Sequence, residues 1–120
     1  MANRTLDGYP APYCDKIETV VDHDGPASYN NTGTFATSGE TINASDFGLG
    51  GFELVQVDAL SSDGLNYAYV ILTGQSITGA NKGNVGVQAV IHWYVLLTNV
   101  EVANAINLSG KSIRLQIRGV

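Results

Sequence analysis

The stretch that decides the fold is VGVQAVIHWYVLLT, residues 85–98, in which apolar side chains recur at every second position. One face of this run is entirely apolar and consists of Val85, Val87, Ala89, Ile91, Trp93, Val95 and Leu97. The other face is mixed and includes Gln88, His92 and Tyr94. A period of two indicates a β-strand that buries one face. Because fourteen residues exceed the usual strand length, we expect a bend or a change of sheet within the run.

Shorter alternating runs flank this stretch on both sides. Residues 66–73 are apolar on both faces, which predicts a strand covered on two sides. Residues 113–118 alternate Ile and Leu with Arg and Gln, which predicts one buried and one solvated face. Further upstream, Phe52 and Leu54 fall on the face opposite Val55, so we expect either a β-bulge or cover on both faces.

Segments rich in Gly, Asn and Asp separate these runs. Residues 22–26 have the composition of a turn, and residues 62–64 that of a hairpin. Residues 34–36 are expected to form a brief strand, and residues 43–48 a single helical turn with a capping box. No segment predicts a longer helix. The chain is therefore predicted to be all-β, an antiparallel β-sandwich or a jelly-roll-like small barrel with at most a one-turn helix near residues 43–48.

The 120 residues are expected to form one domain preceded by an arm. Two prolines and a glycine disfavour regular structure in residues 1–16, which we expect to be an extended N-terminal arm. Tyr9 and Tyr13 give this arm large apolar side chains with polar tips. Such an arm either lies across its own domain or docks on a neighbouring subunit. Residues 17–120 are expected to form a single β-sandwich domain.

Charge and hydropathy exclude several classes of partner. The chain has 6 basic and 11 acidic residues and a net charge of −5, so we expect no nucleic-acid partner. No apolar run reaches about 18 residues, so we expect no membrane partner. The first thirty residues lack an apolar stretch after a basic start, so no secretory signal is expected. The single Cys14 cannot form an intrachain disulfide.

The sequence contains few reactive groups. His23 and His92 are its two histidines; His92 is expected to be a half-buried, hydrogen-bonded residue, and His23 is expected to lie in a turn. The acids beside His23 resemble metal ligands only superficially, because successive residues rarely coordinate one ion. No nucleophile elbow and no phosphate-binding loop is present. We therefore expect no enzyme and no cofactor. A glycan hydrolase would require two of the acids to converge in a cleft.

A scarcity of charge is the chain's most unusual property. Only 14% of its residues are charged, whereas about 25% is average, and glycine and asparagine make up a fifth of the chain. Such surfaces are expected outside cells. Because no export signal is expected, we infer a subunit of a virus particle, made in the host cytoplasm. Uncharged aromatic surfaces are typical of interface cores. The candidate interface residues are Tyr9, Tyr13, Tyr67, Tyr69, Tyr94 and Leu96.

Two segments resemble small structural proteins of tailed bacteriophages. Residues 33–42, read as GTFATSGETI, and residues 45–49, read as SDFGL, follow the order of a Gly-Thr-aromatic strand, a Glu-bearing turn and a one-turn helix ending in Gly-Leu. Residues 107–119 are similar to the closing strand of those proteins, with Leu-Ser, alternating Arg and a final Gly. The matching residues Gly39, Glu40, Phe47, Gly48 and Leu49 are interpreted as residues that form the fold.

The resemblance implies a capsid decoration, or cement, protein with a β-sandwich or jelly-roll fold. Such a protein binds the outside of an assembled head and braces it. The implied partners are the major capsid protein and further copies of the chain itself, with a homotrimer as the expected state. The alternative is a tail, fibre or head-surface module that binds a host glycan. In that case Trp93 and the tyrosines would stack on sugar rings, which requires their side chains to be exposed.

Overall fold

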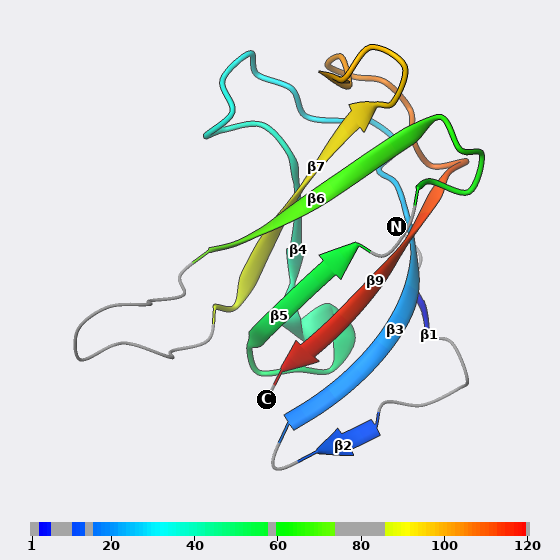
Figure 1. Ribbon diagram of the computed structural model, residues 1–120. Coiled ribbons are helices and arrows are strands. Elements are labelled where there is room, and N and C mark those ends of the chain that lie inside the picture. The colour runs from blue at the N-terminus through cyan, green and yellow to red at the C-terminus, as the bar shows by residue number, and fades with distance from the viewer. Residues whose placement is uncertain (1–2, 6–10, 14–15, 58–59, 74–85, 120) are drawn as a thin grey trace.

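Two antiparallel β-sheets pack together in the computed structural model of the chain (Figure 1). The structure describes residues 3–5, 11–13, 16–57, 60–73 and 86–119. The first sheet consists of β1 (Asn3–Thr5), β2 (Ala11–Tyr13), β3 (Lys16–Asp24), β5 (Phe52–Val57) and β9 (Ser112–Gly119). The second sheet consists of β4 (Glu40–Asn43), β6 (Asn66–Thr73), β7 (Gln88–Val95) and β8 (Val100–Glu101). The all-β prediction is confirmed in its sandwich form.

The five-stranded sheet has the order β1-β3-β9-β5, and β2 also pairs with β3. β9 pairs with residues 17–24 of β3, whereas β1 pairs with residues 21–23 and β2 with residues 16–18. The two short strands therefore lie along one edge of β3. Part of the segment predicted to be an irregular arm thus pairs with its own domain. Pro12 is compatible with β2 because an edge strand leaves one side of its backbone unpaired.

The four-stranded sheet has the order β4-β7-β6, and β8 pairs with the end of β7. The run at residues 85–98 changes sheet, as expected from its length. Gly86 bridges to Phe52 in the other sheet, and the pairing with β4 and β6 begins at Gln88. The strand ends at Val95, and Leu97 lies in the following turn with 94% of its surface exposed.

Three local predictions from the sequence are wrong. Residues 62–64 do form a turn, but it joins β5 in one sheet to β6 in the other because β5 pairs with β9. Residues 34–36 form a turn in which the Thr34 carbonyl accepts the N–H groups of Thr37 and Ser38. The predicted turn at residues 22–26 starts only after Asp24, since strand β3 continues to that residue.

The core lies between the sheets and is formed by their facing side chains. The fully buried apolar members are Val21, Tyr29, Ile42, Ala44, Phe52, Ala89, Ile91, Trp93, Leu108, Ile113, Leu115 and Ile117. In β9 the buried residues alternate with exposed or half-buried ones, which confirms the prediction of one buried face. The register of β5 shifts between Phe52 and Leu54, so Phe52 and Val55 are both buried. This shift confirms the expected β-bulge.

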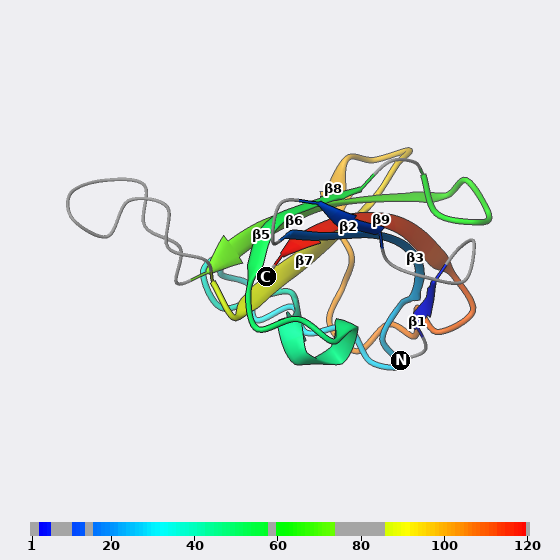
Figure 2. The same cartoon turned by 90° about the horizontal axis from the view of Figure 1, so that it is seen from below.

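A 3₁₀-helix, η2 (Ala44–Phe47), lies where a one-turn helix is predicted. The Asn43 N–H donates to the Asp46 carboxylate at 3.2 Å, and Gly48 ends the turn with a φ of 75°. Figure 2 shows η2 projecting from one side of the sheets.

Among the described residues, no helix has the length and the hydropathy that a membrane span requires.

Gly39, which precedes β4, lets the backbone pack against the Val90 side chain more closely than any residue with a Cβ would allow. Its φ is 113°, and an added Cβ would lie 2.3 Å from Cγ1 of Val90. Gly33 has a similarly positive φ of 84° but open space around it. We expect Gly39→Ala to lower the free energy of unfolding by about 1–3 kcal/mol more than Gly33→Ala, because only Gly39 adds overpacking to backbone strain. Urea denaturation of the two variants measures this difference, and equal losses would contradict it.

Candidate functional site

Five aromatic rings form a continuous stack on the outer face of the four-stranded sheet. We call this set the aromatic ladder, and its order is Tyr67, Tyr94, Tyr69, His92 and Phe35. The centroids of neighbouring rings lie between 4.1 and 5.7 Å apart, and their planes differ by no more than 27°. The rings are thus stacked on one another along the sheet.

The register of β6 and β7 produces this stack. Tyr67 lies directly opposite Tyr94, and Tyr69 directly opposite His92. Tyr69 and Tyr94 are diagonal neighbours, which large side chains can bridge across a sheet. Phe35 reaches His92 from the loop between β3 and β4 at a centroid distance of 4.1 Å, and its ring also lies 6.1 Å from that of Tyr69. Strand pairing and one loop contact therefore build the whole array.

Hydrogen bonds fix the polar tips of the ladder. The hydroxyls of Tyr69 and Tyr94 lie 3.0 Å apart, and the Tyr67 hydroxyl donates to Oδ1 of Asn99. The hydrogen bond to Tyr69, together with burial, raises the pKa of Tyr94, so that its hydroxyl stays neutral. The ladder consequently presents tyrosine rings whose positions are set before any partner arrives.

The ladder is also tied to the core through Glu101 of β8. Nδ1 of His92 lies 3.4 Å from Oε2 of Glu101, and the Tyr29 hydroxyl donates to the same oxygen at 2.7 Å. That hydroxyl also accepts the backbone N–H of Trp93 at 3.2 Å. Burial raises the pKa of Tyr29, and its hydrogen bond to Glu101 adds to this effect. A surface held in this way loses little conformational freedom when it binds.

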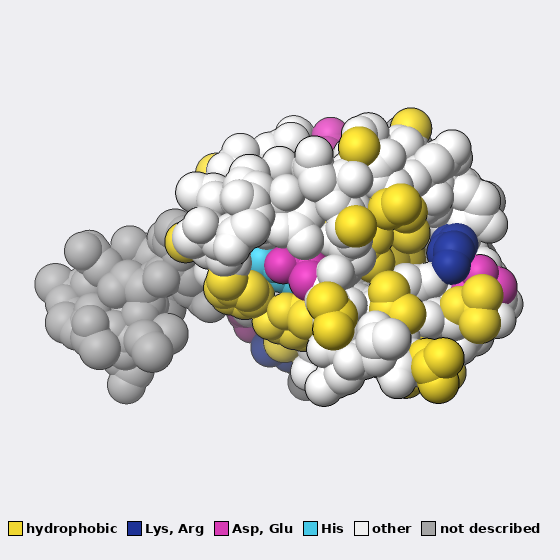
Figure 3. All heavy atoms as spheres, turned by 90° about the horizontal axis from the view of Figure 1, so that it is seen from above, with side chains coloured by type: hydrophobic (Ala, Val, Ile, Leu, Met, Phe, Trp, Pro, Cys, Tyr) yellow, Lys and Arg dark blue, Asp and Glu magenta, His cyan; other side chains and the backbone are white. Residues whose placement is uncertain are grey.

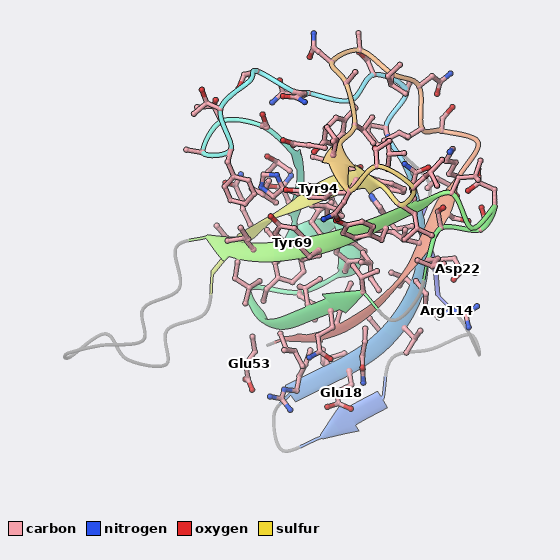
Figure 4. All side chains as sticks on the ribbon, turned by 45° about the horizontal axis from the view of Figure 1, so that its top comes forward. Glu18, Asp22, Glu53, Tyr69, Tyr94 and Arg114 are labelled. Carbon is pink, nitrogen blue, oxygen red and sulfur yellow. The ribbon has the colours of Figure 1, made fainter. Side chains whose placement is uncertain are left out.

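The outer faces of the two sheets differ in charge. β6 and β7 contain no Lys, Arg, Asp or Glu, so that the acid nearest the ladder is the largely buried Glu101 of β8, and 40% of the Tyr69 surface is exposed. On the other sheet, Arg114 pairs with Asp22 at 3.0 Å and Arg118 pairs with Glu53 at 2.9 Å. Figure 4 shows Tyr69 and Tyr94 on β6 and β7, apart from the charged residues of the five-stranded sheet. The aromatic face is therefore the one suited to bind an uncharged surface.

An apolar groove of about 830 Å³ adjoins the ladder. It is lined by Gly64, Leu65, Asn66, Val95, Leu96, Leu97, Val102, Ala103, Ile106, Leu108 and Lys111. Asn66 and Val95 are the chain neighbours of Tyr67 and Tyr94, so the groove lies at the same end of β6 and β7 as these two rings but on the core side of the sheet. Figure 3 shows apolar side chains gathered across this end of the molecule, with a basic side chain beside them. We define the ladder and the groove together as the candidate surface.

Four of the six predicted interface residues lie on this surface. Tyr67, Tyr69 and Tyr94 are members of the ladder, and Leu96 lines the groove. The described residues leave part of the outer face of β6 open, because Tyr69 and Ile71 are both exposed. Tyr9 lies outside the described residues, and the structure describes the backbone of Tyr13 in β2 but not its side chain.

Two members of the ladder are missing from the predicted interface. His92 shares the mixed face of residues 85–98 with Tyr94, so the period of two could have included it. Phe35 carries no such signal, because its contact with His92 joins a loop to a strand more than fifty residues away. Sequence patterns within one segment do not encode such a contact.

The strongest cluster of reactive groups lies inside the sandwich. Nε2 of His23 lies 2.8 Å from Oε2 of Glu40, and Nε1 of Trp93 donates to Oε1 of Glu40 at 3.1 Å. His23 and Trp93 are both 0% exposed. A substrate cannot reach this cluster without disrupting the core, so we interpret it as structural. Trp93 is likewise out of reach of a sugar.

Among the residues that the structure describes, no three His, Cys, Asp or Glu side chains come together as a metal site would require. No protein-family model, no curated protein and no solved structure matches the chain.

Proposed function

We propose that this protein is a non-enzymatic structural subunit of a virus particle. Its most specific role would be that of a decoration protein, which binds the outside of a phage head and stabilises it. The observation that carries the proposal is the stacked, hydrogen-bonded aromatic ladder beside an apolar groove. The phage context rests on the resemblance of residues 33–49 and 107–119 to head proteins.

The composition of this surface supports binding to another protein. Aromatic side chains are enriched in interface cores and charged ones are depleted there, and tyrosine is frequent among the residues that dominate binding energy. Tyr67, Tyr69 and Tyr94 provide this combination on strands without charged residues. Their positions are fixed by stacking and hydrogen bonds, which reduces the entropy lost on association.

The stacking also argues against the alternative of a glycan site. A sugar ring stacks on the open face of an aromatic ring, but each inner ring of the ladder already stacks with two neighbouring rings at centroid distances of 4.1 to 5.7 Å. Trp93 is fully buried. This arrangement favours a protein partner, and we propose the major capsid protein and further copies of the chain.

Because a capsid offers many equivalent binding sites, a modest affinity at each site would be sufficient for attachment. A protein bound at many equivalent sites, and linked to its own copies as in a trimer, gains effective affinity without new contacts. The net charge of −5 would keep free copies apart before they assemble. Low charge then costs little solubility, because the aromatic face becomes covered in the assembled particle.

Co-sedimentation with expanded, undecorated phage heads tests this proposal. We expect saturable binding at micromolar protein, with a fixed number of copies per head. Native mass spectrometry of the free protein, run alongside, reports whether it is already oligomeric. Binding of the isolated protein to a glycan array tests the alternative of a glycan-binding module. Absence of saturable head binding together with selective glycan binding would contradict the proposal.

A further inference from the structure

A lysine, an asparagine and an aspartate meet at the rim of the groove. Nζ of Lys111 lies 2.5 Å from Oδ1 of Asn66 and 3.0 Å from Oδ2 of Asp63. Asn66 is the first residue of β6, and Lys111 directly precedes β9 in the other sheet. A carbonyl bond is about 1.23 Å long, so Nζ is within about 3.7 Å of the Asn66 carbonyl carbon. That separation is close to the one at which reacting atoms are held before bond formation.

The side-chain amide of Asn66 is held in place by its surroundings. Its Nδ2 donates to the Tyr94 carbonyl at 3.0 Å, and its backbone N–H donates to Oγ of Ser61 at 3.0 Å. Only 3% of the Asn66 surface is exposed, so water has little access to the amide. The amide cannot rotate its carbonyl away from Lys111 without losing the bond to Tyr94.

The lysine and its neighbouring acid are positioned as well. The Lys111 N–H donates to the Leu108 carbonyl, and its own carbonyl accepts the N–H of Gly25. Oδ1 of Asp63 accepts the Leu65 N–H and the Ser61 hydroxyl, and these bonds lower the pKa of Asp63 to about 2. The carboxylate is therefore ionised at neutral pH and lies 3.0 Å from the Lys111 ammonium, and its low pKa means that it holds a proton only transiently.

We propose that Lys111 and Asn66 form an intramolecular isopeptide bond, with Asp63 as the base. Asp63 takes one proton from the Lys111 ammonium, and the freed electron pair of Nζ forms a bond to the carbonyl carbon of Asn66. The bond from that carbon to Nδ2 breaks, and the proton that Nζ loses on becoming an amide nitrogen passes to Nδ2. Ammonia leaves and takes the proton held by Asp63, so the products are a secondary amide and an ammonium ion.

The bond would join the two sheets covalently. Asn66 belongs to the four-stranded sheet, and Lys111 leads into β9 at the centre of the five-stranded one. The cross-link would close a loop of the chain from residue 66 to residue 111, which reduces the freedom of the unfolded state as a disulfide does. It requires no oxidant, and it forms within a single copy of the chain.

The intact mass of the purified, denatured full chain tests the proposal. We expect a mass about 17 Da below that of the sequence, since one ammonia is lost. We also expect a branched tryptic peptide that contains both Asn66 and Lys111. The full sequence mass after prolonged incubation of folded protein at pH 8–9 would overturn the proposal.

Two variants separate this reaction from other losses of ammonia. Lys111→Arg keeps the positive charge but removes the amine, and we expect it to retain the full mass. The same loss of 17 Da in Lys111→Arg would place the reaction elsewhere and overturn the proposal. Asp63→Asn is expected to form the bond at least about tenfold more slowly. An unchanged rate in that variant would overturn the role of Asp63 as the base.

Discussion

Glu40→Ala is expected to lower the free energy of unfolding by about 3–5 kcal/mol, because it removes the acceptor of two buried hydrogen bonds and leaves a cavity. Glu40 lies at the start of β4 and reaches across the sandwich to His23 on β3. The same carboxylate accepts the indole N–H of Trp93. The alanine variant removes the acceptor that both buried donors use, and it leaves a cavity between the sheets.

Urea denaturation of Glu40→Ala, Glu40→Gln and Glu18→Ala checks this expectation. Glu40→Gln preserves the volume and one acceptor oxygen, so we expect a smaller loss. Glu18 lies on an exposed face 3.7 Å from Arg118, so Glu18→Ala should cost less than about 1 kcal/mol. If Glu40→Ala proves no more harmful than Glu18→Ala, the buried cluster is not what joins the sheets.

Replacing both Tyr69 and Tyr94 with alanine is expected to weaken binding to phage heads by roughly a hundredfold or more. Each tyrosine is a central member of the ladder, and removal of a dominant interface residue costs about 2 kcal/mol or more. Both side chains lie on the outer face of the sheet, so the core stays intact. This prediction rests on the proposed function, and quantitative co-sedimentation with heads measures it.

A matched variant controls for general effects of substitution. Gln56 and Gln116 lie opposite each other on β5 and β9, in the five-stranded sheet. We expect the double variant Gln56→Ala, Gln116→Ala to bind heads as the unmodified chain does. Thermal denaturation must show that both variants are folded. Equal affinity of the folded Tyr69→Ala, Tyr94→Ala variant and the unmodified chain would remove the ladder from the interface.

Sequence periodicity predicts the strands well because it records burial directly. Ala89, Ile91 and Trp93 alternate in residues 85–98 and are all fully buried in β7. The conflict between Phe52 and Val55 predicts a bulge or cover on both faces, and the register of β5 shifts there. Tyr67, Tyr69 and Tyr94 share the outer face of β6 and β7 because a strand places every second residue on one face.

The sequence could not predict which distant segments pair or contact one another. The turn at residues 62–64 has the same composition whether it closes a hairpin or crosses between sheets, and β9 decides the outcome by pairing with β5. Phe35 joins the ladder through a long-range contact with His92. The resemblance interprets Glu40 as a residue that forms the fold, but no pattern within its own segment predicts that it is buried against His23 and Trp93.

Hydrogen–deuterium exchange of the head-bound protein tests the central claim most directly. The claim is that the chain binds a capsid through the aromatic ladder and the adjoining groove. We predict that binding slows exchange in residues 66–73 and 90–97, while peptides from β3 and β9 exchange as they do in the free chain. Saturable binding with protection confined to β3 and β9, or no protection in β6 and β7, would contradict the claim.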